Sequence, residues 1–276
     1  MKTMKKLVAV ALLLGAATVA QAGKGGSAAA IQSAMSSNGQ DAIIAEVERT
    51  ETLVCGQCVP LVTQLLTDDR YPVRQVAAWW FAKRPGLQHQ MALQMEGSLQ
   101  TGDSIAVRNA ADFLGTTKEY PSLALLRATM TRGGLTVDAR MALVRAAGAM
   151  AHVNGNPILV AGMADADAGV RAAAVYAWRD VLDQPNATPV EALLTDADPH
   201  VRVAAVTVIG AYVDGNARGT LEQIVMTDTN VQVRRDAAWA LGKIGSAASR
   251  TALTAATHDA SPIVASVATA SLAALR

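Results

Sequence analysis

The two cysteines of the chain stand three residues apart, in the segment Cys55-Gly56-Gln57-Cys58. At the start of a helix this spacing can bring the two α-carbons within about 4.4–6.8 Å, the range that a disulfide requires. Three kinds of chemistry fit the pair: a structural disulfide, thiol–disulfide exchange, or metal ligation. Two thiolates are too few to complete a zinc site, and c-type haem attachment needs a histidine where this chain has Val59. We favour a structural disulfide, with a redox-active pair as the alternative and a metal site as the third interpretation.

The redox alternative rests on the position of the pair. A helix N-terminus lowers the pKa of a thiol and makes its thiolate reactive. The loop that a Cys55–Cys58 disulfide closes is so short that it stabilises the fold only modestly, which weakens a purely structural role. Thioredoxin-like enzymes use the same spacing between a strand and a helix, a context that this sequence lacks. Both roles therefore stay open.

No other set of polar side chains forms a catalytic pattern. The four histidines are isolated: none forms a His-Glu pair, and none lies three or four residues from another, at His89, His152, His200 and His258. This excludes the helical-repeat hydroxylases, which bind iron through repeated His-Glu pairs. The chain carries no nucleophile elbow, phosphate loop or dinucleotide fingerprint. We expect a protein that is not an enzyme and that needs no cofactor and no metal.

The elements that would position these side chains belong to a repeat of about 31 residues. Each copy has an arginine that opens an alanine-rich stretch, and the arginines stand 34, 32, 31, 31 and 32 residues apart, at Arg74, Arg108, Arg140, Arg171, Arg202 and Arg234. The better copies carry an aspartate six residues before the arginine, at Asp68, Asp165, Asp196 and Asp228, and Asp259 takes that place in a last, degenerate copy. Each repeat is expected to be helix A, an acidic turn, and helix B.

The repeated aspartates and arginines have a structural interpretation. Because they recur in register, we expect them to form a hydrogen-bonded ladder along the turns rather than a catalytic set. One two-helix unit cannot bury its apolar face alone, whereas stacked units share a continuous core. Small residues such as Ala204 and Ala237 allow the helices to approach closely.

The best copies, Val201–Gly210 and Val233–Gly242, resemble HEAT-like repeats of the phycobilisome-lyase type. The resemblance covers residues from about 56 to the C-terminus and implies an all-α protein, an α-solenoid of about six to seven two-helix repeats. Residues 85–150 depart from the consensus and lack the acidic residue at its usual place, so repeat boundaries there are undetermined. The resemblance says little about function, because such repeats serve unrelated tasks.

Aromatic residues recur at one position of the repeat, five residues after the arginine. In successive copies that position holds Trp79, Phe113, Arg145, Tyr176, Thr207 and Trp239. The resemblance implies that this position faces outward from helix B and that helix B lines the concave surface. We predict a partner-binding stripe of Trp79, Phe113, Tyr176 and Trp239, suited to a protein or peptide, or alternatively to a sugar-containing ligand. The alternative is packing against the neighbouring repeat, and Trp80 and Trp178, at other phases, are predicted to be core.

The first 22 residues have the layout of an export signal. Lys2, Lys5 and Lys6 precede an apolar stretch from Leu7 to Ala20, and Ala20-Gln21-Ala22 fits the signal-peptidase rule. We expect cleavage after Ala22 and a bacterial periplasmic or secreted protein. Residues 23–40 are expected to form a flexible leader rich in Gly, Ser and Ala, and 41–276 to form the repeat array as a single domain. Nothing after the signal is long and apolar enough for stable membrane insertion, which needs about 20 residues.

Composition limits the function classes that remain. Hydrophobic residues make up 51% of the 276 and charged residues 17%, which excludes intrinsic disorder. Cleavage would take three of the 24 basic residues and leave 21 against 23 acidic, a charge of −2 that argues against a nucleic-acid partner. Export also argues against a bilin lyase, which acts inside the cell. The leading hypothesis is an exported scaffold that binds a protein or peptide on its concave face, and the alternative is a redox-linked accessory protein acting through Cys55 and Cys58.

Overall fold

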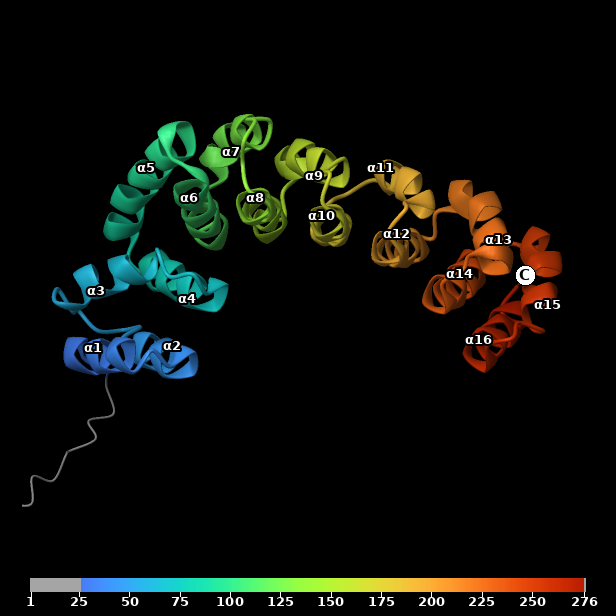
Figure 1. The fold of residues 1–276 in the computed structure, drawn as a ribbon, viewed down its shortest axis with the longest axis horizontal. Helices are drawn as coiled ribbons and strands as arrows, with labels where there is room; N and C mark the ends of the chain where they lie inside the picture. The colour runs from blue at the N-terminus through green and yellow to red at the C-terminus, as the bar shows by residue number, and fades with distance from the viewer. Residues whose placement is uncertain (1–25, 276) are drawn as a thin grey trace, which may run out of the picture.

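The computed structural model describes residues 26–275, and these form a curved row of helices (Figure 1). Sixteen α-helices and five short 3-10 helices account for the regular structure of the described residues, with no strand among them. The protein is therefore all-α, as the repeat pattern predicts. In the described range no helix combines the length and the apolar character needed to cross a membrane. The predicted signal peptide, residues 1–22, lies outside the described residues.

The helices follow one another with short connections. The α-helices are α1 (Ala28–Ser37), α2 (Gln40–Glu48), α3 (Cys58–Leu65), α4 (Tyr71–Ala82), α5 (Pro85–Thr101), α6 (Ser104–Thr116), α7 (Leu123–Met130), α8 (Val137–Met150), α9 (Asn156–Met163), α10 (Ala168–Asp180), α11 (Thr188–Glu191), α12 (Pro199–Tyr212), α13 (Arg218–Thr227), α14 (Val231–Ile244), α15 (Arg250–Ala256) and α16 (Pro262–Ala273). Short 3-10 helices precede or extend several helices A: η1 (Tyr120–Ser122), η2 (Val153–Gly155), η3 (Ala192–Thr195), η4 (Gly215–Ala217) and η5 (Ala247–Ser249).

From α3 onward the odd-numbered helices form the outer row of the arch and the even-numbered helices the inner row (Figure 1). Each inner helix packs against the next inner helix, and the tightest pairings are α6 with α8, α12 with α14 and α14 with α16. The inner helices are the helices B of the sequence pattern, so helix B lines the concave side as the resemblance implies. The molecule is an α-solenoid.

The N-terminal end of the array differs from the expectation of a flexible leader over residues 23–40. Residues 28–37 form α1, capped by the Ser27 hydroxyl, which accepts the Ala30 N–H at 3.1 Å. The helix buries Ile31 and Ala34, too few apolar residues to give a readable period. Asp41 lies in the first turn of α2. From α3 to α16 the array has seven helix pairs, within the six to seven expected, and α1 and α2 add one more pair before them.

The inner helices approach one another at glycine. A Cβ added to Gly115 of α6 would lie 2.5 Å from the Ala146 Cα of α8, and one added to Gly242 of α14 would lie 2.6 Å from the Ser271 Cβ of α16. These distances leave no room for a side chain at either position. Gly115 lies seven residues after Arg108, whereas Gly148, Gly210 and Gly242 lie eight residues after their repeat arginines. The neighbouring alanines that the sequence assigns to the packing face are fully buried, at Ala204, Ala205, Ala237 and Ala238.

Candidate functional site

The aspartate–arginine ladder runs along the C-terminal repeats. Each arginine donates from Nε and Nη2 to the two carboxylate oxygens of the aspartate one repeat further on, over 2.6–3.0 Å, in the rungs Arg140–Asp165, Arg171–Asp196, Arg202–Asp228 and Arg234–Asp259. The third nitrogen, Nη1, donates to a backbone carbonyl of the arginine's own turn, as Arg171 does to the Asp165 oxygen at 2.9 Å. The hydrogen bonds from Arg171 lower the pKa of Asp196, and those from Arg234 lower the pKa of Asp259. The rungs join neighbouring repeats.

The ladder does not extend to the first predicted members. Asp68 pairs with Arg70 of its own turn, with Nη2 at 2.7 Å, and Arg108 makes only a 3.3 Å contact with Asp69 in addition to a bond to its neighbour Asn109. Two glycines, Gly102 and Gly134, stand where the aspartates of the next repeats would be. Arg74 and Arg108 therefore have no rung partner and bind elsewhere.

Arg74 instead enters a buried network that the repeat pattern does not reveal. Its Nε and Nη2 donate to Asp112 Oδ2 at 3.0 and 2.6 Å, while Arg145 Nη2 donates to Oδ1 of the same carboxylate at 2.9 Å. The side chains of Arg74 and Asp112 are 3% and 1% exposed. The Arg145 guanidinium lies 4.4 Å from the centre of the Tyr71 ring, and burial together with the Asp112 charge raises the pKa of that phenol. An aspartate at a helix-B position that other repeats fill with Ala or Val is the sequence signal that marks this site.

The predicted aromatic stripe is discontinuous. Tyr176 and Trp239 are exposed by 38% and 39%, but Phe113 is only 1% exposed, so the prediction that it faces outward is wrong. Phe113 packs edge-on against Phe81 at 5.8 Å, and nine consecutive residues of α6, 107–115, are buried, which leaves that part of the helix no free face. Arg145, at the same repeat position, donates hydrogen bonds to the buried carboxylate of Asp112.

The other tryptophans divide between surface and core. Trp79 is half-buried in a separate hollow of about 280 Å³ with Pro72 and Val76, far along the chain from the C-terminal aromatics, and Lys83 Nζ lies 5.2 Å from its ring centre. Trp80 and Trp178 are buried, which confirms their assignment to the core. Each satisfies its indole N–H internally, Trp80 on Thr50 Oγ1 at 2.8 Å and Trp178 on a backbone carbonyl.

Tyr176 and Trp239 lie in one groove on the concave side. The groove has a volume of about 610 Å³ and is formed by four successive inner helices, α10, α12, α14 and α16, through Tyr176, Val203, Thr207, Gln232, Arg235, Asp236, Trp239, Ile263 and Val267. The Trp239 ring contacts Gly210 of α12 so closely that no Cβ would fit there. One corner is polar, because Gln232 and Arg235 both donate to Asp236. The groove offers an apolar floor with a fixed indole on it.

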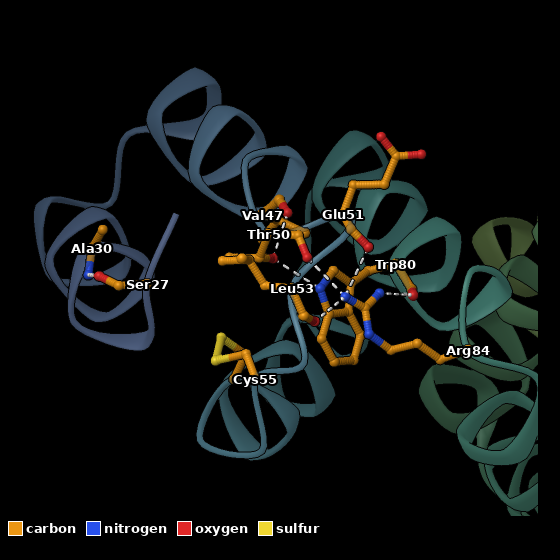
Figure 2. The surroundings of a disulfide bond; sticks show 10 residues. Ser27, Ala30, Val47, Thr50, Glu51, Leu53, Cys55, Trp80 and Arg84 are labelled. Carbon is orange, nitrogen blue, oxygen red and sulfur yellow. Dashed lines mark hydrogen bonds between the residues drawn. A yellow bond between two sulfur atoms is a disulfide. The ribbon is translucent and has the colours of Figure 1, made fainter. Parts of the chain in front are cut away.

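Cys55 and Cys58 are joined by a disulfide at the start of α3 (Figure 2). Cys58, the first residue of that helix, is fully buried, whereas Cys55 is half-buried and lines a pocket of about 680 Å³. Between residues 26 and 275, no three His, Cys, Asp or Glu side chains gather into a metal-binding group. Because Cys58 begins α3, a helix of the outer row, the cysteine pair lies on the outer side of the arch, away from the C-terminal groove (Figure 1).

Comparisons with known proteins agree with this architecture. Residues 186–273, which contain α11 to α16, match the family described as HEAT repeats. No curated protein matches the sequence. Among solved structures, YibA of Escherichia coli is similar over 88% of this chain and 91% of its own, with 15% identity and a TM-score of 0.57.

Two further structures show weaker likeness. Human deoxyhypusine hydroxylase in complex with glycerol aligns over 90% of this chain and 95% of its own, with 16% identity and a TM-score of 0.38. An engineered protein aligns over 77% and 94%, with 19% identity and a TM-score of 0.41. Residues 186–273 thus match HEAT repeats, and the sixteen-helix arch with its likeness to YibA shows that the described residues fold as an α-solenoid of HEAT-like helix pairs.

Proposed function

We propose that the protein is a non-enzymatic scaffold whose concave groove over α10, α12, α14 and α16 binds an apolar segment of a protein partner. The observation that carries the proposal is the pair of exposed aromatics in that groove, Trp239 at 39% and Tyr176 at 38%. Stacked helical repeats present long concave surfaces of this kind to their partners. Large aromatic side chains dominate the binding energy of such interfaces.

The position of Trp239 favours binding over incidental exposure. Its ring fills the space that a side chain at Gly210 would take, so this glycine gives the indole a seat on α12. A side chain that is fixed before binding loses less entropy when a partner covers it. The Arg235–Asp236 pair at the edge supplies a polar rim beside the apolar floor.

The test is a selection of peptides from a random library displayed on phage, with the full chain as bait. Affinities of the selected peptides are then measured by fluorescence anisotropy for the natural protein and for Trp239→Ala. We expect the variant to bind at least about tenfold more weakly, the effect of a central hot spot of about 2 kcal/mol.

Two control variants make the result specific. Met226→Ala removes a side chain that is 57% exposed on α13, in the outer row, and should leave affinity unchanged. Trp79→Ala alters the separate N-terminal hollow and should also be neutral. Equal binding by natural protein and Trp239→Ala, with both folded by circular dichroism, would place the binding surface elsewhere.

We further propose that the scaffold acts after export. The support is the order of the three lysines, the apolar stretch and Ala20-Gln21-Ala22 in the first 22 residues. When the full chain is expressed in a bacterium, the protein released by osmotic shock should have the intact mass of a chain that begins at Gly23. Recovery of uncleaved protein from the cytoplasm alone would contradict the proposal.

A further inference from the structure

The segment between α2 and α3 is held by a set of hydrogen bonds that does not involve the disulfide (Figure 2). The Arg84 Nη2 donates to the carbonyl oxygens of Thr50, Glu51 and Leu53 at 2.7, 3.0 and 3.0 Å. Its guanidinium stacks over the Trp80 indole at 3.5 Å. The indole N–H in turn donates to Thr50 Oγ1 at 2.8 Å. The path of this segment is therefore fixed by Arg84, Trp80 and Thr50.

The disulfide adds little to this arrangement. It joins residues only three apart, and the stabilisation that a cross-link gives through the unfolded chain falls with the size of the loop it closes. The helix that follows it, α3, is anchored by its own buried side chains, among them Val62 and Leu65. Breaking the disulfide should leave both the segment and α3 in place, so the fold leaves this bond free for chemistry.

The two cysteines differ in the way that directional exchange requires. Thiol–disulfide exchange begins when a thiolate reaches one sulfur in line with the bond, and the other sulfur leaves. Cys55 is half-buried on a pocket wall, whereas Cys58 is fully buried. An incoming thiol can therefore attack only at Cys55.

The pocket beside Cys55 specifies what could carry that thiol. Its lining is mainly apolar, with Leu53, Val54, Val59, Trp80 and Leu87. Two cations, Lys83 and Arg84, share its rim with Glu51, whose carboxylate binds Lys83 at 2.9 Å. Apolar walls favour an apolar side chain next to the attacking cysteine, and the cations favour the thiolate over the thiol. The charge and lining fit a cysteine-bearing protein segment.

We propose that Cys55–Cys58 is a thiol–disulfide exchange site that oxidises a pair of cysteines in a client protein segment, with an apolar residue beside the attacking cysteine seated in the adjoining pocket. This activity is additional to the proposed binding in the concave groove and uses a different part of the molecule. It makes the protein a stoichiometric oxidant of its client, one disulfide for each molecule.

The reaction has two steps. A client thiolate attacks the Cys55 sulfur, the Cys55–Cys58 bond breaks, and its electron pair leaves on Cys58, which takes a proton from water. The second client thiolate then attacks the client sulfur of the mixed disulfide, and Cys55 leaves as a thiolate. The client loses two electrons and two protons as its disulfide forms, and the protein disulfide gains both to become two thiols.

The test uses the oxidised full chain and two reduced synthetic peptides, each with two cysteines. One peptide has leucine beside the first cysteine and the other has aspartate there. Samples are quenched with acid, free thiols are alkylated with N-ethylmaleimide, and products are located by peptide mass spectrometry. We expect the early adduct on Cys55 with Cys58 alkylated, and about tenfold faster reaction of the leucine peptide, which corresponds to about 1.4 kcal/mol.

Matched variants separate the pocket from general reactivity. Val54→Asp places a carboxylate at a fully exposed rim position and should slow the leucine peptide by about threefold or more through repulsion of the thiolate. Val160→Asp, on exposed α9 surface, should not change the rate. Circular dichroism of Cys55→Ser/Cys58→Ser should match that of the natural protein.

Three results would overturn the proposal. An adduct on Cys58, or on both cysteines equally, would contradict the direction of attack. Equal rates for the two peptides would remove the role of the pocket. Loss of α3 or of the thermal transition in Cys55→Ser/Cys58→Ser would show that the disulfide serves the fold.

Discussion

The buried carboxylate of Asp112 shows how one residue can redirect its surroundings. In the C-terminal repeats each arginine has an aspartate one repeat away, but Arg74 faces Gly102 at that position and turns to Asp112 on α6. Arg145 reaches the same carboxylate from α8. One acceptor thus links α4, α6 and α8 through two guanidinium groups. The same network engages the Arg145 guanidinium, which stays 30% exposed.

At this scale we predict that Asp112→Ala lowers the free energy of unfolding by about 3–5 kcal/mol, because it leaves the 3%-exposed Arg74 as an uncompensated buried charge. Urea denaturation followed by circular dichroism measures the change. Asp180→Ala is the matched control, since its ion pair with Arg179 is on the surface, and it should change stability by less than about 0.5 kcal/mol.

A compensating double variant checks the cause. Arg74→Met with Asp112→Leu removes both buried charges, and Arg145, which is 30% exposed, can turn to water. This protein should recover much of the stability lost in Asp112→Ala, since apolar replacements of a buried pair are often neutral. If Asp112→Ala costs no more than Asp180→Ala, the network carries no net stability.

At the scale of the helices, the repeat pattern predicts where each helix B lies better than it predicts which of its side chains are exposed. The position of each arginine predicts helix B and the place of the close crossings, and Gly115, Gly148, Gly210 and Gly242 all lie against a neighbouring inner helix. The same phase predicts an outward Phe113, yet α6 is covered along 107–115. Exposure depends on neighbours several tens of residues away, which a single repeat does not encode. The two aromatics that do reach the groove, Tyr176 and Trp239, lie where the copies are most regular.

Two glycines of the inner and outer rows should respond in opposite directions to alanine. Gly115→Ala places a methyl group against the backbone of Ala146 and should cost about 1–3 kcal/mol as α6 and α8 separate. Gly97→Ala, in α5, meets no atom within 4 Å and should stabilise by about 0.5–1 kcal/mol through helix propensity. Thermal unfolding of the two variants gives the signs, and a shift in the same direction for both would refute the packing argument.

For the molecule as a whole, the repeat pattern predicts an α-solenoid, and the family resemblance implies that helix B lines its concave side. The first helix pair of the array is not predicted. The repeats from Arg140 onward follow the consensus closely, and the structure places four ladder rungs there. The first helix pair has no ladder rung. It is joined to the array by buried side chains such as Ile31 and Val47, and by the Arg70 guanidinium, which donates to the Asn38 carbonyl at 2.8 Å. Pattern recognition fails where the contacts are apolar and irregular. The pocket beside Cys55 likewise depends on residues distant in sequence, namely Trp80 of α4 and Arg84 at the start of α5.

The ladder predicts how global stability varies with pH. The aspartates Asp165, Asp196, Asp228 and Asp259 have folded-state pKa values below the reference of 3.8. A lowered folded pKa contributes stability that is present above the unfolded pKa and lost as the pH falls through the folded one. The melting temperature should therefore change little between about pH 7 and 5 and fall below about pH 4. Asp196→Asn should make that acid decline shallower, and an identical decline would contradict the role of the rung.

The rung geometry also bears on how such a chain can lengthen. Every rung uses one donor and one acceptor at fixed phase, and both occur in a single copy, for example Asp196 and Arg202. In this half, the aspartate of a duplicated copy would pair with the arginine of the preceding repeat, and its arginine would pair with the aspartate of the following repeat. A duplication in the gene would therefore yield a repeat that already has both rung partners. In the other half, Asp112 serves two fixed arginines and Gly102 and Gly134 offer no acceptor, so an inserted copy would meet no matching partner. Growth and shrinkage of the array during evolution should accordingly be confined to its C-terminal half.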